Sequence, residues 1–148
     1  MRFLFILFFL LIISTQVYSI ETKPLGRLIV FIENFESDEG NVRVHLYDYD
    51  TRQYFPAISD KAYRLVISPI KDNKAIVVFE GLPYGSYALT VHHDKNSNVK
   101  MDKNFLGMPA EGWGLSRNII PILSLPTFED CQFELKKEIT NIRIIVRN

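Results

Sequence analysis

Cysteine, net charge and long apolar runs are all scarce in this chain of 148 residues. Its single cysteine, Cys131, cannot form an intramolecular disulfide, which excludes a small domain stapled by disulfides. Lysine and arginine total 17, and aspartate and glutamate also total 17. This balance gives no strong electrostatic field, so we expect no nucleic-acid partner. Beyond the first residues, no apolar run is long enough to cross a bilayer, which excludes a membrane-embedded domain.

The first residues have the pattern of a secretory signal peptide. Arg2 is followed by an unbroken apolar run over residues 3–13 and then by Val17-Tyr18-Ser19, which ends in a small residue. Eleven apolar residues fall well short of the roughly 20 that a membrane-spanning helix needs. The sequence therefore predicts a signal peptide at residues 1–19 and one mature domain at residues 20–148. We expect this domain to be secreted or periplasmic, without stable insertion in a membrane.

Alternation of apolar and polar residues is the dominant pattern of the mature chain. In "GNVRVHLYD", for example, Val42, Val44 and Leu46 fall on one face of an extended segment. Turn-forming residues separate the alternating or β-branched runs, and no segment has a helical stripe. Seven runs are predicted to be strands, at residues 25–35, 40–48, 62–70, 74–82, 85–93, 130–137 and 140–147. Such a series favours an all-β fold, a single antiparallel β-sandwich of about seven strands.

A tight turn at "GLPYGSY" supports this fold class. Pro83 presets one turn torsion and Gly85 permits a positive φ. The stretch also resembles transthyretin-like and carboxypeptidase-regulatory-like sandwich domains, so the fold is expected to be immunoglobulin/transthyretin-like. Within the last two strands, Cys131, Phe133 and Leu135 alternate, as do Ile142, Ile144 and Val146. We interpret these two runs as a hairpin with one shared buried face, in which Cys131 is a small buried hydrophobe.

A long loop at about residues 94–127 carries the most specific pattern. Asp94, Asn96, Asn98, the Lys100 carbonyl and Asp102 occupy positions 1, 3, 5, 7 and 9 of an EF-hand loop. Calcium takes about six to eight oxygen ligands, so this spacing predicts an EF-like calcium loop on a β scaffold.

Two EF-hand positions depart from the pattern. Val99 stands where the sharp turn needs Gly, and Phe105 stands where a bidentate Glu is expected. Asn104 or Glu111 are candidates for the missing ligand. The alternative is a polar turn in which the Asn and Asp side chains cap their own backbone. Zinc has less support, because the neighbouring His92 and His93 point to opposite faces of a strand.

The sequence as a whole resembles a bacterial family. The stretch "YALTVHHDKNSNVKMDKNFLGMPAEGWGLSRN", with "GNVRVHLYD" before it and "PTFEDCQFEL" after it, is similar to the exported bacterial proteins grouped as domain of unknown function 2141. The resemblance covers about residues 28–146 and implies a secreted, small β domain of uncharacterised function. Members commonly have Asn-Gly where this chain has Asn98-Val99, a departure that bears on metal affinity.

Two other classes of function remain open. Trp113, with Tyr47, Tyr49, Tyr54 and Phe55, could form an aromatic platform of a carbohydrate- or peptide-binding module, with a cell-envelope or saccharide partner. Alternatively, Trp113 packs the loop onto the sandwich. A hydrolase could use a pair of carboxylates among Asp94, Asp102 and Glu111. No nucleophile motif or oxyanion hole accompanies these residues, so the sequence favours a protein without enzymatic activity.

Overall fold

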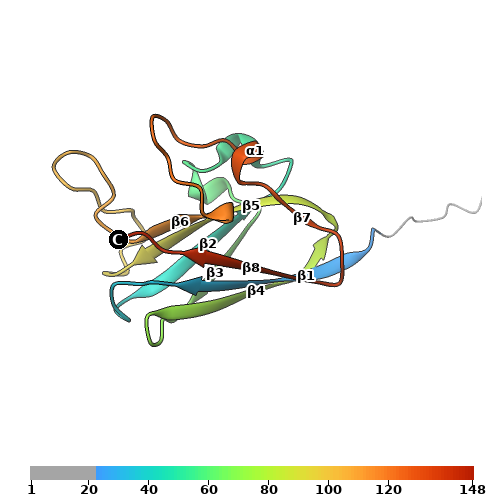
Figure 1. Ribbon diagram of the computed structural model, residues 1–148, viewed down its shortest axis with the longest axis horizontal. Helices are drawn as coiled ribbons and strands as arrows, with labels where there is room; N and C mark the ends of the chain where they lie inside the picture. The colour runs from blue at the N-terminus through green and yellow to red at the C-terminus, as the bar shows by residue number, and fades with distance from the viewer. Residues whose placement is uncertain (1–22) are drawn as a thin grey trace, which may run out of the picture.

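The computed structural model describes residues 23–148, which form two β-sheets packed face to face (Figure 1). The predicted all-β sandwich is therefore confirmed. Its strands are β1 (Leu25–Glu33), β2 (Asn41–Tyr47), β3 (Arg64–Ser68), β4 (Lys74–Pro83), β5 (Gly85–Asp94), β6 (Trp113–Leu115), β7 (Phe133–Leu135) and β8 (Ile139–Ile145). Short helical turns connect them: η1 (Arg52–Tyr54), η2 (Ser59–Lys61), η3 (Ser116–Asn118) and α1 (Phe128–Cys131).

All seven predicted runs contain a strand, and the structure adds an eighth, β6, within the long loop. One sheet has the order β4-β1-β8. The other has the order β3-β2-β5-β6, with β7 paired to the remaining part of β5. Most pairs are antiparallel, as predicted, but β8 runs parallel to β1. The predicted hairpin of β7 with β8 is wrong, because β7 pairs with β5 and β8 with β1.

Alternation along the strands builds the core between the sheets. Leu28, Val30 and Ile32 of β1 are fully buried, and the residues between them face outward. They belong to a cluster with Val44 of β2 and Val91 of β5 from the opposite sheet. Burial of one apolar face from each sheet is what makes a sandwich stable. The core therefore follows from the period of two in the sequence.

A second, smaller hydrophobic cluster lies beside β5. It contains Cys131, which is fully buried, together with Tyr47, Phe55, Leu115 and Phe128. The predicted burial of Cys131 is confirmed, but its predicted place on a strand is wrong, because it ends helix α1. Thr127 caps this helix in a capping box with Asp130: Thr127 Oγ1 accepts from the Asp130 N–H, and Asp130 Oδ2 accepts from the Thr127 N–H. The local cap thus overrides the alternation that predicted a strand.

The long loop has more structure than its composition predicts. Trp113 exchanges two backbone hydrogen bonds with Arg147, from N to O at 2.9 Å and back at 2.8 Å. These bonds join β6 of one sheet to the chain that follows β8 of the other. Gly114 lies so close to β8 that an added Cβ would stand 2.8 Å from Ile144 Cγ2. β6 therefore closes one side of the sandwich and divides the predicted loop into two.

The predicted signal peptide at residues 1–19 lies outside the described residues. Among residues 23–148 the structure contains no helix that is long and apolar enough to cross a membrane. The mature domain is predicted from residue 20, and the first strand of the described sandwich begins at Leu25.

Candidate functional site

The loop that follows β5 begins at a buried carboxylate. Asp94 is the last residue of β5 and is fully buried. Its Oδ1 accepts a hydrogen bond from the backbone N–H of Asn98 at 3.0 Å, and its Oδ2 accepts one from Val99 at 3.0 Å. A buried carboxylate requires such compensation, since its desolvation is costly. Asp94 therefore folds the loop back over the end of the strand.

Three further predicted side chains meet within this turn. The Asn96 Nδ2 donates to Asp102 Oδ2 at 2.6 Å, and the Asn98 Nδ2 donates to Asp102 Oδ1 at 3.1 Å. Asn96 Oδ1 also accepts from the Asn98 N–H at 3.1 Å. Asp94, Asn96, Asn98 and Asp102 are thus linked to one another within a few residues of chain. The loop brings together four of the side chains that the EF-like spacing predicts as ligands.

The backbone of the turn has the conformation that calls for glycine. Val99 has φ +70° and Ser97 has φ +57°, both in the left-handed region. This region is sterically unfavourable for a β-branched side chain, which costs on the order of 1 to 2 kcal/mol. The residue at position 6 of the predicted pattern therefore adopts the expected backbone conformation with an unfavourable side chain.

Glu111 closes the base of the loop. Its Oε1 accepts from the Lys95 N–H at 2.9 Å, and its Oε2 accepts from the Asp102 N–H at 3.1 Å. The same Oε2 lies 2.8 Å from Nε2 of His92, and the side chains of Glu111 and His92 are both buried. Burial by itself would raise the pKa of Glu111. The bonds from His92, Asp102 and Lys95 outweigh it and hold that pKa below its ordinary value.

His92, which the sequence analysis weighed only as a zinc ligand, is a further residue of this site. Ligand-type atoms of His92, Asp94 and Glu111 all lie within 4.8 Å of one another, and all three residues are buried. His92 and Asp94 are two residues apart on β5, so they lie on the same face of the strand. That spacing is the signal that would have identified His92. His93 points the other way: its Nε2 contacts the Glu39 carbonyl and its ring meets Phe35 edge to face.

Of the predicted ligands Lys100 and Asn104, only Asn104 has another role in the geometry. Asn104 Oδ1 accepts from the backbone N–H groups of Leu106 and Met108, so it caps a separate small turn at the tip of the loop. Lys100 contributes its N–H to Asn98 Oδ1 at 2.7 Å. The structure therefore brings together Asp94, Asn96, Asn98, Asp102 and the base residue Glu111, and it directs the side chain of Asn104 elsewhere.

The aromatic residues considered for a binding platform do not share one surface. Tyr47 and Phe55 are buried in the second cluster, with their rings edge to face at 5.3 Å. Trp113 packs against the same cluster and is partly buried. Tyr49 is exposed and lies under the guanidinium of Arg52. Most of these aromatic side chains thus stabilise the fold, which leaves Tyr49 as the exposed one of the set.

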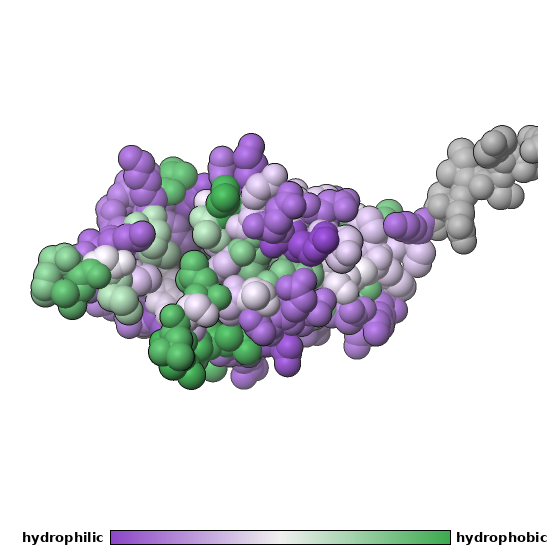
Figure 2. All heavy atoms as spheres, turned by 90° about the horizontal axis from the view of Figure 1, so that it is seen from above, coloured by the Kyte–Doolittle hydropathy of each residue, from purple (hydrophilic) through white to green (hydrophobic). Residues whose placement is uncertain are grey.

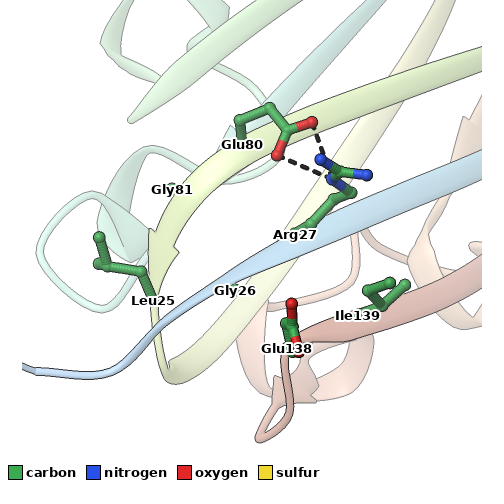
Figure 3. Close-up of a pocket in the computed structure, with 7 residues that line it drawn as sticks. All are labelled: Leu25, Gly26, Arg27, Glu80, Gly81, Glu138 and Ile139. Carbon is green, nitrogen blue, oxygen red and sulfur yellow. Dashed lines mark hydrogen bonds and ion pairs between the residues drawn. The ribbon is translucent and has the colours of Figure 1, made fainter.

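The carboxylates considered for hydrolysis lie outside two surface pockets of the described residues. One pocket lies between β1, β4 and the start of β8, where an ion pair of Arg27 with Glu80 at 2.8 Å spans it (Figure 3). The other is formed by the segment after η1 and by α1. Asp94, Asp102 and Glu111 line neither. Their own oxygens are occupied by backbone and amide donors, an arrangement suited to shaping a loop.

Comparison with known proteins identifies a family and no closer relative. No curated protein and no solved structure matches the chain. One family matches residues 30–143, which include parts of both sheets and the whole loop after β5. With more than half of its length matched, the chain belongs to the family described as "Uncharacterized protein conserved in bacteria (DUF2141)".

Proposed function

We propose that this protein is an exported, non-enzymatic β-sandwich whose loop after β5 binds one calcium ion in a structural role. The observation that carries the proposal is that Asn96 and Asn98 both bond the Asp102 carboxylate, in the same turn whose backbone N–H groups at Asn98 and Val99 bond the Asp94 carboxylate. Hard cations prefer carboxylate and amide oxygens from a flexible loop, and four such side chains are available here.

Rotation of two amide groups would complete this arrangement of ligands. The amide nitrogens of Asn96 and Asn98 donate to the two oxygens of Asp102. Turning each amide about its last bond would place its oxygen next to the Asp102 carboxylate, and would give up the bonds that Asn96 Oδ1 accepts from the Asn98 N–H and Asn98 Oδ1 accepts from the Lys100 N–H. Such oxygens repel each other unless a cation lies between them. The proposed ion therefore takes over the role that the two amide hydrogens have without it.

The proposed ligand set extends to the base of the loop. A carboxylate offers about four lone-pair sites, and Glu111 uses three of them for Lys95, Asp102 and His92. The remaining site, together with the Lys100 carbonyl, would raise the number of oxygens toward the six or so that calcium requires. Asn104 is omitted from this set because its side-chain oxygen caps the turn at the loop tip.

The expected affinity is low. Asp94 and Asp102 are the two carboxylates at EF-type positions, and Val99 adds strain to the turn. We therefore expect a dissociation constant of roughly 0.1 to 1 mM, which is the range of extracellular modules. With ~1 mM calcium and a constant near 0.1 mM, binding would stabilise the fold by about 1.4 kcal/mol. This is enough to order a loop, and too little to make folding depend on the ion.

Calorimetric titration and thermal melting with Ca²⁺, Mg²⁺ and EDTA test the proposal. We expect calcium to raise the melting temperature by a few degrees, and magnesium to raise it less because it demands stricter octahedral geometry. Asp94→Ala and Asp102→Asn should abolish the calcium effect. Val99→Gly should strengthen binding, because glycine adopts a positive φ without strain.

Asp38→Ala is the matched control. Its carboxylate also accepts two backbone N–H bonds, from Asp72 at 2.9 Å and Asn73 at 2.7 Å, but it lies outside the loop. This variant should lose stability and keep the calcium effect. If the wild-type domain gives no heat of binding, and its melting curve is the same in calcium and in EDTA, the polar-turn interpretation replaces the proposal.

A further inference from the structure

Large apolar side chains are exposed at the tip of the loop between β5 and β6. Phe105 is 95 % exposed, and Leu106 and Met108 are also well exposed. In Figure 2, the green group at the end of the molecule opposite the grey chain corresponds to this tip. Fully exposed neighbouring apolar residues are unfavourable in water, and a contiguous group of them marks an interaction site.

The segment between η3 and α1 presents a second apolar tip. Ile122 is 89 % exposed and Leu123 is 99 % exposed, with Ile120 and Leu125 exposed beside them. This segment forms a separate projection in the ribbon view (Figure 1), and the darker green group of Figure 2 lies at the corresponding place. The two tips arise at opposite ends of one short unit, β6 with η3, and both project from the same half of the molecule.

Backbone groups of the first tip form hydrogen bonds with other groups of the same turn. Asn104 N–H donates to the Met108 carbonyl, and the Gly107 N–H donates to the Asn104 carbonyl, both at 2.9 Å. The Asn104 side chain accepts from Leu106 and Met108. A segment that enters an apolar medium must pair its backbone groups internally. This turn does so, while its apolar side chains point outward.

Basic residues stand at the base of the tips. Lys100 and Lys103 are exposed beside the first tip, and Arg117 is exposed where the second begins. Asp102 is the one acidic residue in the segment 96–110, and its carboxylate is bonded to Asn96 and Asn98. The first tip therefore has a positively charged base, whereas at the second tip Arg117 donates to the Asp130 carbonyl beside the exposed acidic side chains of Glu129 and Asp130. The chain as a whole has no net charge, so the positive charge of Lys100 and Lys103 is a local feature of the first tip.

We propose that the two tips dock on an anionic phospholipid bilayer. The apolar side chains of both tips would enter the boundary between headgroups and acyl chains, and Lys100 and Lys103 at the first tip would contact the phosphates. The shape supports this occupant, because narrow projections bury their tips in a soft layer more readily than against a flat protein surface. Binding of this kind is peripheral and does not require a membrane-spanning segment.

Co-sedimentation with lipid vesicles tests the proposal. The domain from residue 20 is used, because residues 23–148 contain both sheets and both clusters, whereas the apolar run at residues 3–13 would itself bind lipid. Measurements are made in EDTA, so that the result does not depend on the calcium proposal. We expect binding to phosphatidylglycerol vesicles and weaker binding to phosphatidylcholine vesicles.

Three double variants separate the contributions. Phe105→Ser with Leu106→Ser, and Ile122→Ser with Leu123→Ser, should each weaken binding about tenfold or more. Lys100→Glu with Lys103→Glu should weaken binding to phosphatidylglycerol by a similar factor and should remove the preference for it. The matched control, Ile76→Ser with Val78→Ser on the outer face of β4, also removes two exposed apolar side chains and should bind as the wild type does.

Two results would overturn the proposal. One is a wild-type domain that does not sediment with either kind of vesicle. The other is a pair of tip variants that are folded by circular dichroism and bind as tightly as the wild type. Concentration-dependent self-association without vesicle binding, lost in the tip variants, would replace the bilayer by a second copy of the chain.

Discussion

His45 shows how a single buried side chain links this fold to pH. It lies on β2, is 6 % exposed, and its Nδ1 has no hydrogen-bond partner among the described residues. Burial first, and then the charges of Arg43 and His92, lower the pKa of His45 from 6.5 to about 4. The ring is therefore neutral in the folded protein at neutral pH, because the charged form cannot be solvated there.

We predict that the free energy of unfolding decreases as the pH is lowered from about 6.5 to about 4, because of His45. The unfolded chain binds a proton at this residue near pH 6.5, and the folded chain does so only near pH 4. The contribution of the neutral ring is therefore complete above pH 6.5 and decreases by up to ~1.4 kcal/mol for each pH unit below it. Urea denaturation midpoints at pH 7 and pH 5 measure this change.

His45→Leu is the informative variant for this prediction. It removes both the titration and the buried nitrogen, so its midpoint should change less between pH 7 and pH 5 than that of the wild type. An equally large change in the variant would mean that another group carries the pH dependence.

The strands β7 and β8 show how an element can be recognised and yet be assigned to the wrong partner. β7 pairs with β5 through Gly85 opposite Leu135 and Tyr87 opposite Phe133. β8 pairs in parallel with β1 along its whole length. Leu135 is fully buried within the main core, whereas Phe133 only packs against its margin. The alternation predicted the faces of these strands, and the pairing decides how deeply each residue is buried.

We predict that Leu135→Ala destabilises the domain more than Phe133→Ala does. Removal of a fully buried leucine leaves a cavity and costs about 2 to 5 kcal/mol. Phe133 is larger but partly exposed, so its truncation should cost less than the roughly 3 to 5 kcal/mol of a fully buried phenylalanine. Urea denaturation of both variants measures the two free energies of unfolding. A larger loss for Phe133→Ala would contradict the pairing of β7 with β5.

At the scale of the whole molecule, the two sheets of the described residues form one unit. β1 begins at Leu25, and the two hydrophobic clusters consist of residues from 28 onward. The parallel pair β1 with β8 and the contact of Trp113 with Arg147 tie the beginning and end of the domain together. The first described strand therefore begins after the segment that resembles a signal peptide.

We predict that the chain is processed after Ser19 on export. The pattern of Arg2, the apolar run at residues 3–13 and Val17-Tyr18-Ser19 motivates this expectation. Intact-mass measurement of the protein from the exported fraction of its native host should give the mass of residues 20–148. A mass that still includes residues 1–19 would show that the segment is retained.

Much of the candidate site could be predicted from the sequence, because most of its residues are close together along the chain. Asp94, Asn96, Asn98 and Asp102 lie in one turn, and a turn is a local structure. The position that requires a left-handed backbone was also identifiable, since Val99 stands where the pattern has glycine. His92 was missed because its bond to Glu111 joins residues 19 positions apart and depends on the return of the chain to β6.

The sequence by itself determined which segments are strands and which of their faces are buried, because a period of two is a local property of the chain. Only the tertiary structure decided that β8 runs parallel to β1, that β7 joins β5 and that β6 closes the sandwich. These choices depend on packing between distant segments, as in the contact of Gly114 with Ile144. They also place Glu111 at the base of the loop, where it meets His92. No local pattern encodes such contacts, because they form only when both sheets are in place.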